Sequence, residues 1–166
     1  AALSKIYSFL KLKGCDYEVI VVDDGSSDNT ALVAGQSELA KEGKLILLKN
    51  AKNAGKGFSV RRGILSSRGE FVLFSDADLS TPITEADKLL HYIAEGFDIV
   101  IGSRSIADSD VRVHQPWLRE RMGKIFNFFV KTLLVRNFND TQCGFKLFKG
   151  DIARQIAGLF KIDGFC

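Results

Sequence analysis

Short apolar runs alternate with amphipathic helical patterns along most of the chain, and this alternation limits the possible folds more than any other feature. Four segments, each with four apolar residues, read as strands: 18–23, 44–50, 70–76 and 97–104. Helical patterns lie between them, at about 30–41, through Val60, Ile64 and Leu65, and at Ala86, Leu89, Leu90 and Ile93. Continuous apolar strands that alternate with helices predict an α/β domain, with a mostly parallel sheet covered by helices on both faces.

The two ends of the chain depart from this alternation. Leu3, Ile6, Tyr7 and Leu10 have helical spacing at the start, and a long helix is predicted over 117–135 after an irregular, polar segment. The run "CGFKLFK" predicts a further strand, at an edge of the sheet. Because the sequence begins inside a helical pattern and stops at "DGFC", we expect residues 1–166 to be one domain that lacks segments at both ends.

Composition excludes several classes of protein. The net charge of +3 is too small to predict a nucleic-acid partner. The three cysteines are far apart and odd in number, which argues against a disulfide framework and favours a reducing compartment. No run approaches the roughly 18 apolar residues of a membrane span. We therefore expect a cytoplasmic protein without a transmembrane segment.

Acidic pairs follow two of the predicted strands. Asp23 and Asp24 end the first, and Asp76 and Asp78 end the third, while Arg104 closes the fourth. Ligands of open parallel sheets bind beyond the carboxyl ends of the strands, so these groups are predicted to converge. The Asp76 pair is compatible with a divalent metal beside a phosphate, with a phosphoryl-accepting nucleophile, or with a plain acidic turn.

The loop between the second strand and its helix is rich in glycine and lysine. "NAKNAGKG" lacks the spacing of a P-loop, yet its glycines allow a phosphate to approach a helix N-terminus. Lys56, between Gly55 and Gly57, is the lysine that we expect to contact that phosphate.

Five ordered motifs then carry a specific resemblance: "VVDDGSSDNT", "NAGKGFSVRRG", "FVLFSDADLSTP", "GSR" and "DTQCGFKLF". In this order and spacing, the chain resembles glycosyltransferase family 2, and within it the dolichyl-phosphate glucosyltransferases and their bacterial polyprenyl-phosphate relatives. The resemblance implies a GT-A fold that binds a nucleotide-sugar donor. It also implies that the family's opening strand, with its Pro-x-Tyr-Asn-Glu segment, is absent from this chain.

The resemblance implies a role for each acidic residue. Asp23 and Asp24 would contact the nucleoside end of the donor. Asp76 and Asp78 would form a DxD motif, in which Asp78 holds Mg²⁺ or Mn²⁺ against the diphosphate and Asp76 lies near the ribose and the metal. The "DTQCGFKLF" segment favours UDP-glucose as donor, and so does Ser80, which stands where many mannosyl relatives have Gln; GDP-mannose stays an alternative.

The implied acceptor is a polyprenyl phosphate of the dolichyl type, at the cytoplasmic face of a membrane. A lipid phosphate is already anionic and needs no protein base, but it needs fixed cations, and arginine binds phosphate in a bidentate manner. Arg104 is the first candidate, which we also place among the catalytic residues, and Arg119 is the second.

Two rival classes fit parts of the pattern. A haloacid-dehalogenase-like phosphatase has a DxDx[TV] nucleophile motif, but Ser80 occupies the Thr/Val position here and two strands precede the motif. A receiver-like signalling domain has an acidic pair after its first strand, but it would not explain the second acidic pair or "DTQCGFKLF".

Overall fold

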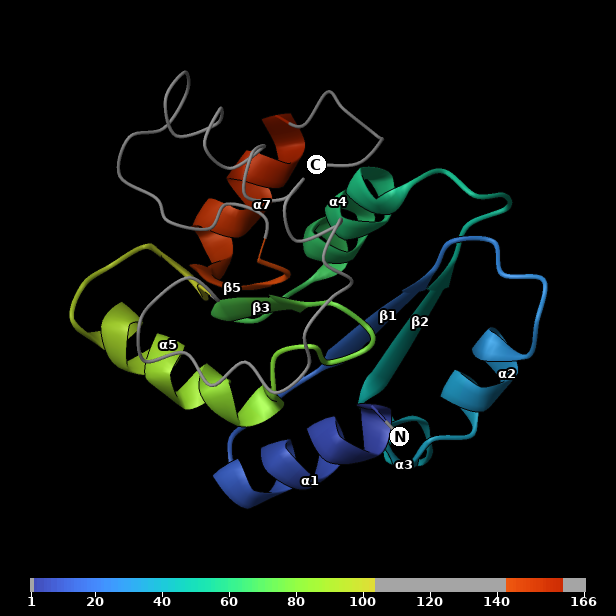
Figure 1. Ribbon diagram of the computed structural model, residues 1–166, viewed down its shortest axis with the longest axis horizontal. Helices are drawn as coiled ribbons and strands as arrows, with labels where there is room; N and C mark the ends of the chain where they lie inside the picture. The colour runs from blue at the N-terminus through green and yellow to red at the C-terminus, as the bar shows by residue number, and fades with distance from the viewer. Residues whose placement is uncertain (1, 104–142, 160–166) are drawn as a thin grey trace, which may run out of the picture.

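The computed structural model describes residues 2–103 and 143–159, arranged as helices around short strands (Figure 1). The first part of the chain forms α1 (Ala2–Lys13), β1 (Val19–Asp23), α2 (Thr30–Gly35), α3 (Glu38–Lys41), β2 (Leu45–Lys49) and α4 (Lys56–Ser66). The rest forms β3 (Phe71–Ser75), the 3₁₀ turn η1 (Ile83–Glu85), α5 (Ala86–Ala94), β4 (Ile99–Ile101), β5 (Phe145–Lys149) and α7 (Gly150–Leu159). The predicted α/β class is confirmed.

The described strands form two sheets. β1 and β2 are parallel, with Val19 opposite Leu45 and Asp23 opposite Lys49. The second sheet has the order β3-β5-β4, and β5 is antiparallel to both neighbours. The prediction of β5 at an edge was therefore wrong. Its residues explain the central place, because Phe145 and Leu147 are buried on one face of the sheet while Phe148 packs on the other.

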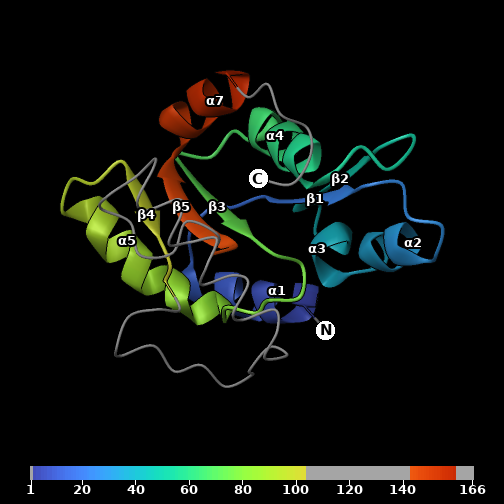
Figure 2. The same cartoon turned by 45° about the horizontal axis from the view of Figure 1, so that its top comes forward.

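Helices cover both faces of these strands (Figure 2). On one face α4 and α7 pack together, and Ile64, Ala153 and Ala157 form a small core with the half-buried Val60, Val72 and Phe148. On the other face, α5 and η1 contribute to the larger core, which α1 also contacts: Ile83, Ala86, Leu89, Ile93, Cys143, Phe145 and Leu147. The predicted amphipathic face of α5 is confirmed by the buried Ala86, Leu89 and Ile93, whereas Leu90 is exposed.

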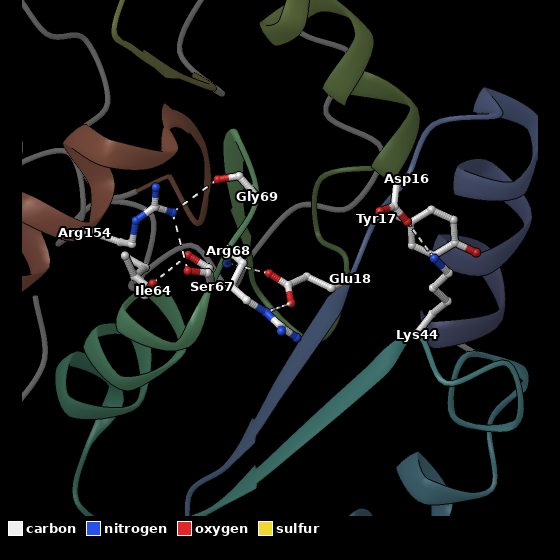
Figure 3. A network of polar contacts seen from close by, with 9 residues as sticks. All are labelled: Asp16, Tyr17, Glu18, Lys44, Ile64, Ser67, Arg68, Gly69 and Arg154. Atoms are coloured by element: carbon white, nitrogen blue, oxygen red, sulfur yellow. Dashed lines mark hydrogen bonds and ion pairs between the residues drawn. The ribbon is translucent and has the colours of Figure 1, made fainter.

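The two sheets lie side by side, and the edge of β1 that is not paired with β2 faces the edge of β3 that is not paired with β5 (Figures 1 and 2). Polar contacts fix the starting ends of both strands (Figure 3). Glu18, just before β1, accepts a hydrogen bond of 2.6 Å from the backbone amide of Arg68, which precedes β3. Arg154 of α7 donates to the backbone oxygens of Ser67 and Gly69 in the same turn. The Glu18–Arg68 bond brings the starting ends of β1 and β3 together, and the contacts of Asp24 and Asp76 with residues 54–56 bring their carboxyl ends close as well.

The single helix predicted over 30–41 is divided into α2 and α3. Ser37 causes the break, since its hydroxyl donates to the Ala34 oxygen and accepts from the Ala40 amide, and so caps a new helix. The N-cap of α2 is neither a serine nor an aspartate. Asn29 takes that position without a side-chain cap, and the Asp28 carboxylate instead accepts from the Thr30 amide.

Several predictions fall outside the described residues. The helix predicted over 117–135 and the candidate residues Arg104 and Arg119 belong to this group. Among the residues that the structure does describe, no helix combines the length and the apolar character needed to cross a membrane.

Candidate active site

Asp23 ends β1 with a buried carboxylate, only 2% exposed. Its Oδ1 accepts a hydrogen bond of 2.9 Å from the backbone amide of Ser26 in the following turn. Hydrogen bonding from Ser26, through its side chain first and then its amide, lowers the pKa of Asp23 below its ordinary value. Its Oδ2 is buried and accepts no hydrogen bond from any described residue. A buried carboxylate oxygen without a donor is costly, so this atom is suited to a ligand that donates one.

Asp24 is engaged by the loop that follows β2. Its Oδ1 accepts from the Asn50 amide group at 2.7 Å and from the Ala54 backbone at 2.8 Å, and its Oδ2 accepts from the Gly55 backbone at 2.9 Å. These bonds lower the pKa of Asp24, the Ala54 amide first and the Asn50 side chain next. Both oxygens of Asp24 therefore hold the loop, and this carboxylate organises the site.

Asn50 connects the same loop to α4. It is 4% exposed, its side-chain nitrogen also donates to the Ser59 hydroxyl at 3.0 Å, and its side-chain oxygen accepts from Arg62. The backbone amide of Asn50 donates to the backbone oxygen of Asp23. The loop was predicted to contact phosphate, but Asn50 was not predicted as a site residue. Its signal was an asparagine directly after a buried strand, where a side chain with both donor and acceptor can join two segments.

Asp76 follows β3 and pairs with the lysine predicted to contact phosphate. The Lys56 ammonium lies 2.9 Å from Asp76 Oδ1, and both side chains are about one third exposed (36% and 37%). Lys56 also lies over the Phe74 ring, 5.6 Å from its centroid. The backbone amide of Asp76 donates to the Gly144 oxygen at 3.0 Å, which ties the acidic turn to the start of β5. Lys56 and Asp76 are thus brought together from separate motifs.

Asp78 lies in the tight turn after Asp76. The Leu79 amide donates to the backbone oxygen of Asp76 at 3.1 Å. The exposed Asp78 carboxylate accepts from the Ser80 amide at 2.9 Å. Ser80 lowers the pKa of Asp78, by its side chain first and its amide second, and Lys56 adds a smaller effect of the same sign. Leu79 has a φ of +50°, an uncommon conformation for a residue with a branched side chain. The turn holds Asp78 ionised at neutral pH and open to solvent.

Three consecutive residues join the two acidic clusters at one edge. The amides of Ala54 and Gly55 bind Asp24, and the next side chain, Lys56, binds Asp76. Gly55, with a φ of +96°, is the N-cap of α4, so the N-terminus of that helix, with its partial positive charge, lies beside Asp24. The structure thus brings Asp23, Asp24, Lys56 and Asp76 together at the carboxyl ends of β1 and β3.

The donor set of this edge suits a hard divalent cation. No cluster of three potential ligands from His, Cys, Asp and Glu occurs within residues 2–103 and 143–159. Mg²⁺ is typically held by one or two protein carboxylates and by phosphate oxygens of the substrate. Asp76 and Asp78 meet that requirement, because both come from one turn and Asp76 already binds a cation, the Lys56 ammonium.

Comparison with known proteins agrees with this geometry. The family described as "Glycosyl transferase family 2" matches residues 3–157. The chain is 44% identical to a protein named dolichyl-phosphate beta-glucosyltransferase from Dictyostelium discoideum, over 89% of this chain and 47% of the relative. Proteins of the same name from Drosophila melanogaster and Homo sapiens are 40% and 39% identical, over 93% and 82% of this chain and 51% and 44% of the relatives.

These matches extend over nearly all of the chain, which spans about half the length of the curated relatives that it matches. They exclude the two rival classes, the phosphatase and the receiver domain, with which the acidic pair alone is compatible. The chain belongs to glycosyl transferase family 2.

Proposed function

We propose that this chain is the catalytic part of an enzyme that transfers glucose from UDP-glucose to a polyprenyl phosphate of the dolichyl type, with inversion at the anomeric carbon. The observation that carries the proposal is the joining of Asp24, Lys56 and Asp76 by one short loop at the sheet edge. The names of the relatives support the choice of glucose and of the dolichyl phosphate acceptor.

The donor would lie with its nucleoside toward Asp23 and its diphosphate toward Lys56. The buried Asp23 Oδ2, which accepts no hydrogen bond from a described residue, matches a ribose hydroxyl or an N–H of the base. The Lys56 ammonium and the N-terminus of α4 match the negative charge of the diphosphate. Asp24 would act on the donor indirectly, because its oxygens fix the two residues that precede Lys56.

Asp76 and Asp78 would hold Mg²⁺ or Mn²⁺ beside the diphosphate. The cation would neutralise charge that develops on the departing UDP, as divalent ions do in phosphate chemistry. The Asp76–Lys56 ion pair supports this assignment, since it puts an anionic oxygen and a cation where metal and phosphate would meet.

The acceptor needs no general base. An oxygen of the lipid phosphate is already anionic, so it bonds to the anomeric carbon of glucose while the bond from that carbon to the diphosphate breaks, and UDP leaves. Two anions must then approach each other, and fixed cations on the acceptor side lower the repulsion. We assign this role to Arg104 and Arg119, which lie outside the described residues, and place the reaction at the cytoplasmic surface of a membrane.

Radiolabelled donor tests the proposal directly. The full-length protein is incubated with UDP-[¹⁴C]glucose, Mg²⁺ or Mn²⁺, and a polyprenyl phosphate, and the label that enters the organic phase is counted. GDP-[¹⁴C]mannose is tested in parallel. We expect lipid-linked label from the uridine donor, and preference for the guanosine donor would overturn the assignment.

A matched pair of aspartates controls for the site. Asp78→Asn removes an anionic oxygen from the proposed metal site. Asp87→Asn removes an exposed carboxylate of α5, which forms a surface ion pair with Lys13. Loss of transfer in the first variant with normal transfer in the second supports the role of Asp78; equal effects in both would contradict it.

A further inference from the structure

Gly144 lies closer to the Asp76 carboxylate than any residue with a side chain could. A Cβ atom built on Gly144 would lie 1.8 Å from Asp76 Oδ2 and 2.3 Å from its Cγ. Carbon and oxygen atoms that are not bonded stay more than 3 Å apart, so the absence of a side chain at Gly144 is what admits the carboxylate. Gly144 has no positive φ, so its backbone conformation does not itself demand glycine.

The backbone fixes Asp76 at this place. The backbone amide of Asp76 donates to the backbone oxygen of Gly144, and the backbone oxygen of Asp76 accepts from the Leu79 amide. Since the main chain is held on both sides, a Cβ at Gly144 would displace the short Asp76 side chain by rotation about χ1. Its Oδ1 would then leave Lys56, now 2.9 Å away.

We propose that Gly144 is a positioning residue, which holds the Asp76 carboxylate in the orientation that faces Lys56 and the metal. The "CGFKLF" part of the "DTQCGFKLF" motif thus acts in the site through its backbone: β5 starts there, inserts between β3 and β4, and brings a residue without a side chain against the acidic turn. The role toward the metal rests on the proposed function, whereas the role toward Asp76 and Lys56 does not.

The first test needs no metal and no turnover. Thermal unfolding is measured for the wild type, Gly144→Ala, Asp76→Ala and the double variant, all in chelator. If Gly144 acts through the carboxylate, Gly144→Ala lowers Tm in the wild-type background and has no further effect in Asp76→Ala, since the displaced group is gone. An equal fall in Tm in both backgrounds would overturn the inference and assign Gly144 to the backbone of β5.

The second test measures the metal. The Mn²⁺ concentration that half-maximally enhances UDP binding is compared for the same variants, and for Gly158→Ala as a control. A Cβ at Gly158, in α7, meets no described atom within 4 Å. We expect an increase of about 10–100-fold for Gly144→Ala, the usual loss when a metal ligand is misplaced by its support, and no change for the control.

The positioning role of Gly144 and the proposed function can fail separately. If Gly144→Ala leaves the Mn²⁺ requirement unchanged, the positioning role toward the metal is wrong even if glucose is transferred. If the wild-type enzyme transfers no glucose but the Tm effects still disappear in the Asp76→Ala background, the proposed function is wrong and the contact between Gly144 and Asp76 stands.

Discussion

Replacing Asn50 with alanine should break the connection between Asp24 and helix α4 in the proposed donor site. The substitution deletes three side-chain hydrogen bonds, to Asp24, Ser59 and Arg62, and leaves a small buried cavity. A hydrogen bond with a charged partner contributes about 1.5–3 kcal/mol, and one between neutral groups about 0.5–1.5 kcal/mol. Two of the three bonds are of the charged kind.

The net loss should lie near the lower end of these ranges. Arg62 keeps its bond to the Lys49 backbone oxygen at 2.8 Å, and Asp24 keeps the amides of Ala54 and Gly55. We therefore expect Asn50→Ala to lower the free energy of unfolding by about 3.5 kcal/mol. UDP affinity should fall as well, because the loop that leads into Lys56 loses its side-chain bonds to Ser59 and Arg62 of α4.

Urea denaturation and calorimetric titration with UDP measure the two effects. Asn53→Ala is the matched control, since it removes an exposed asparagine from the same loop. It should leave both the unfolding free energy and the UDP affinity close to those of the wild type. If Asn50→Ala is as stable as Asn53→Ala and binds UDP equally well, Asn50 does not connect the site and the reasoning is refuted.

Three further predictions concern the charged groups. Asp78→Asn should abolish the enhancement of UDP binding by Mn²⁺ without unfolding the protein, and titration with and without the ion checks this; an unchanged enhancement would remove Asp78 from the metal site. Because the pKa of Asp24 is lowered in the folded state, its contribution to stability is complete above the ordinary value of 3.8 and is lost as the pH falls below it. Denaturation midpoints between pH 5 and 2 should thus fall less steeply in Asp24→Asn than in the wild type, and equal slopes would contradict the assignment. Arg104→Ala and Arg119→Ala should each weaken use of the lipid phosphate by about 1.5–3 kcal/mol, seen in kcat/KM, with little change in UDP affinity; equal losses of both would place the arginines on the donor side.

Local pattern alone predicted most of the elements in the described part of the chain. The apolar runs before Asp23–Asp24 and Asp76–Asp78 are strands, and the spacing of Ala86, Leu89 and Ile93 is that of a helix with one buried face. Period and burial are properties of neighbouring residues, so a sequence contains them directly. The position of both acidic pairs at strand ends followed from the same pattern.

Tertiary structure decided which role each polar residue of the site has. The sequence suggested equal roles for Asp23 and Asp24, but burial leaves Asp23 an oxygen without a described donor, while the folded loop engages both oxygens of Asp24. Asn50 gained its role only when α4 packed beside the loop and brought Ser59 and Arg62 to it.

The place of β5 is the clearest case of what the sequence by itself could not determine. Its apolar residues predicted a strand, because alternation is local. Its insertion between β3 and β4, and with it the approach of Gly144 to Asp76, depends on pairing between segments about 70 residues apart along the chain. Such pairing is selected by the burial of both faces of the sheet at once, which becomes defined only when all the strands are together.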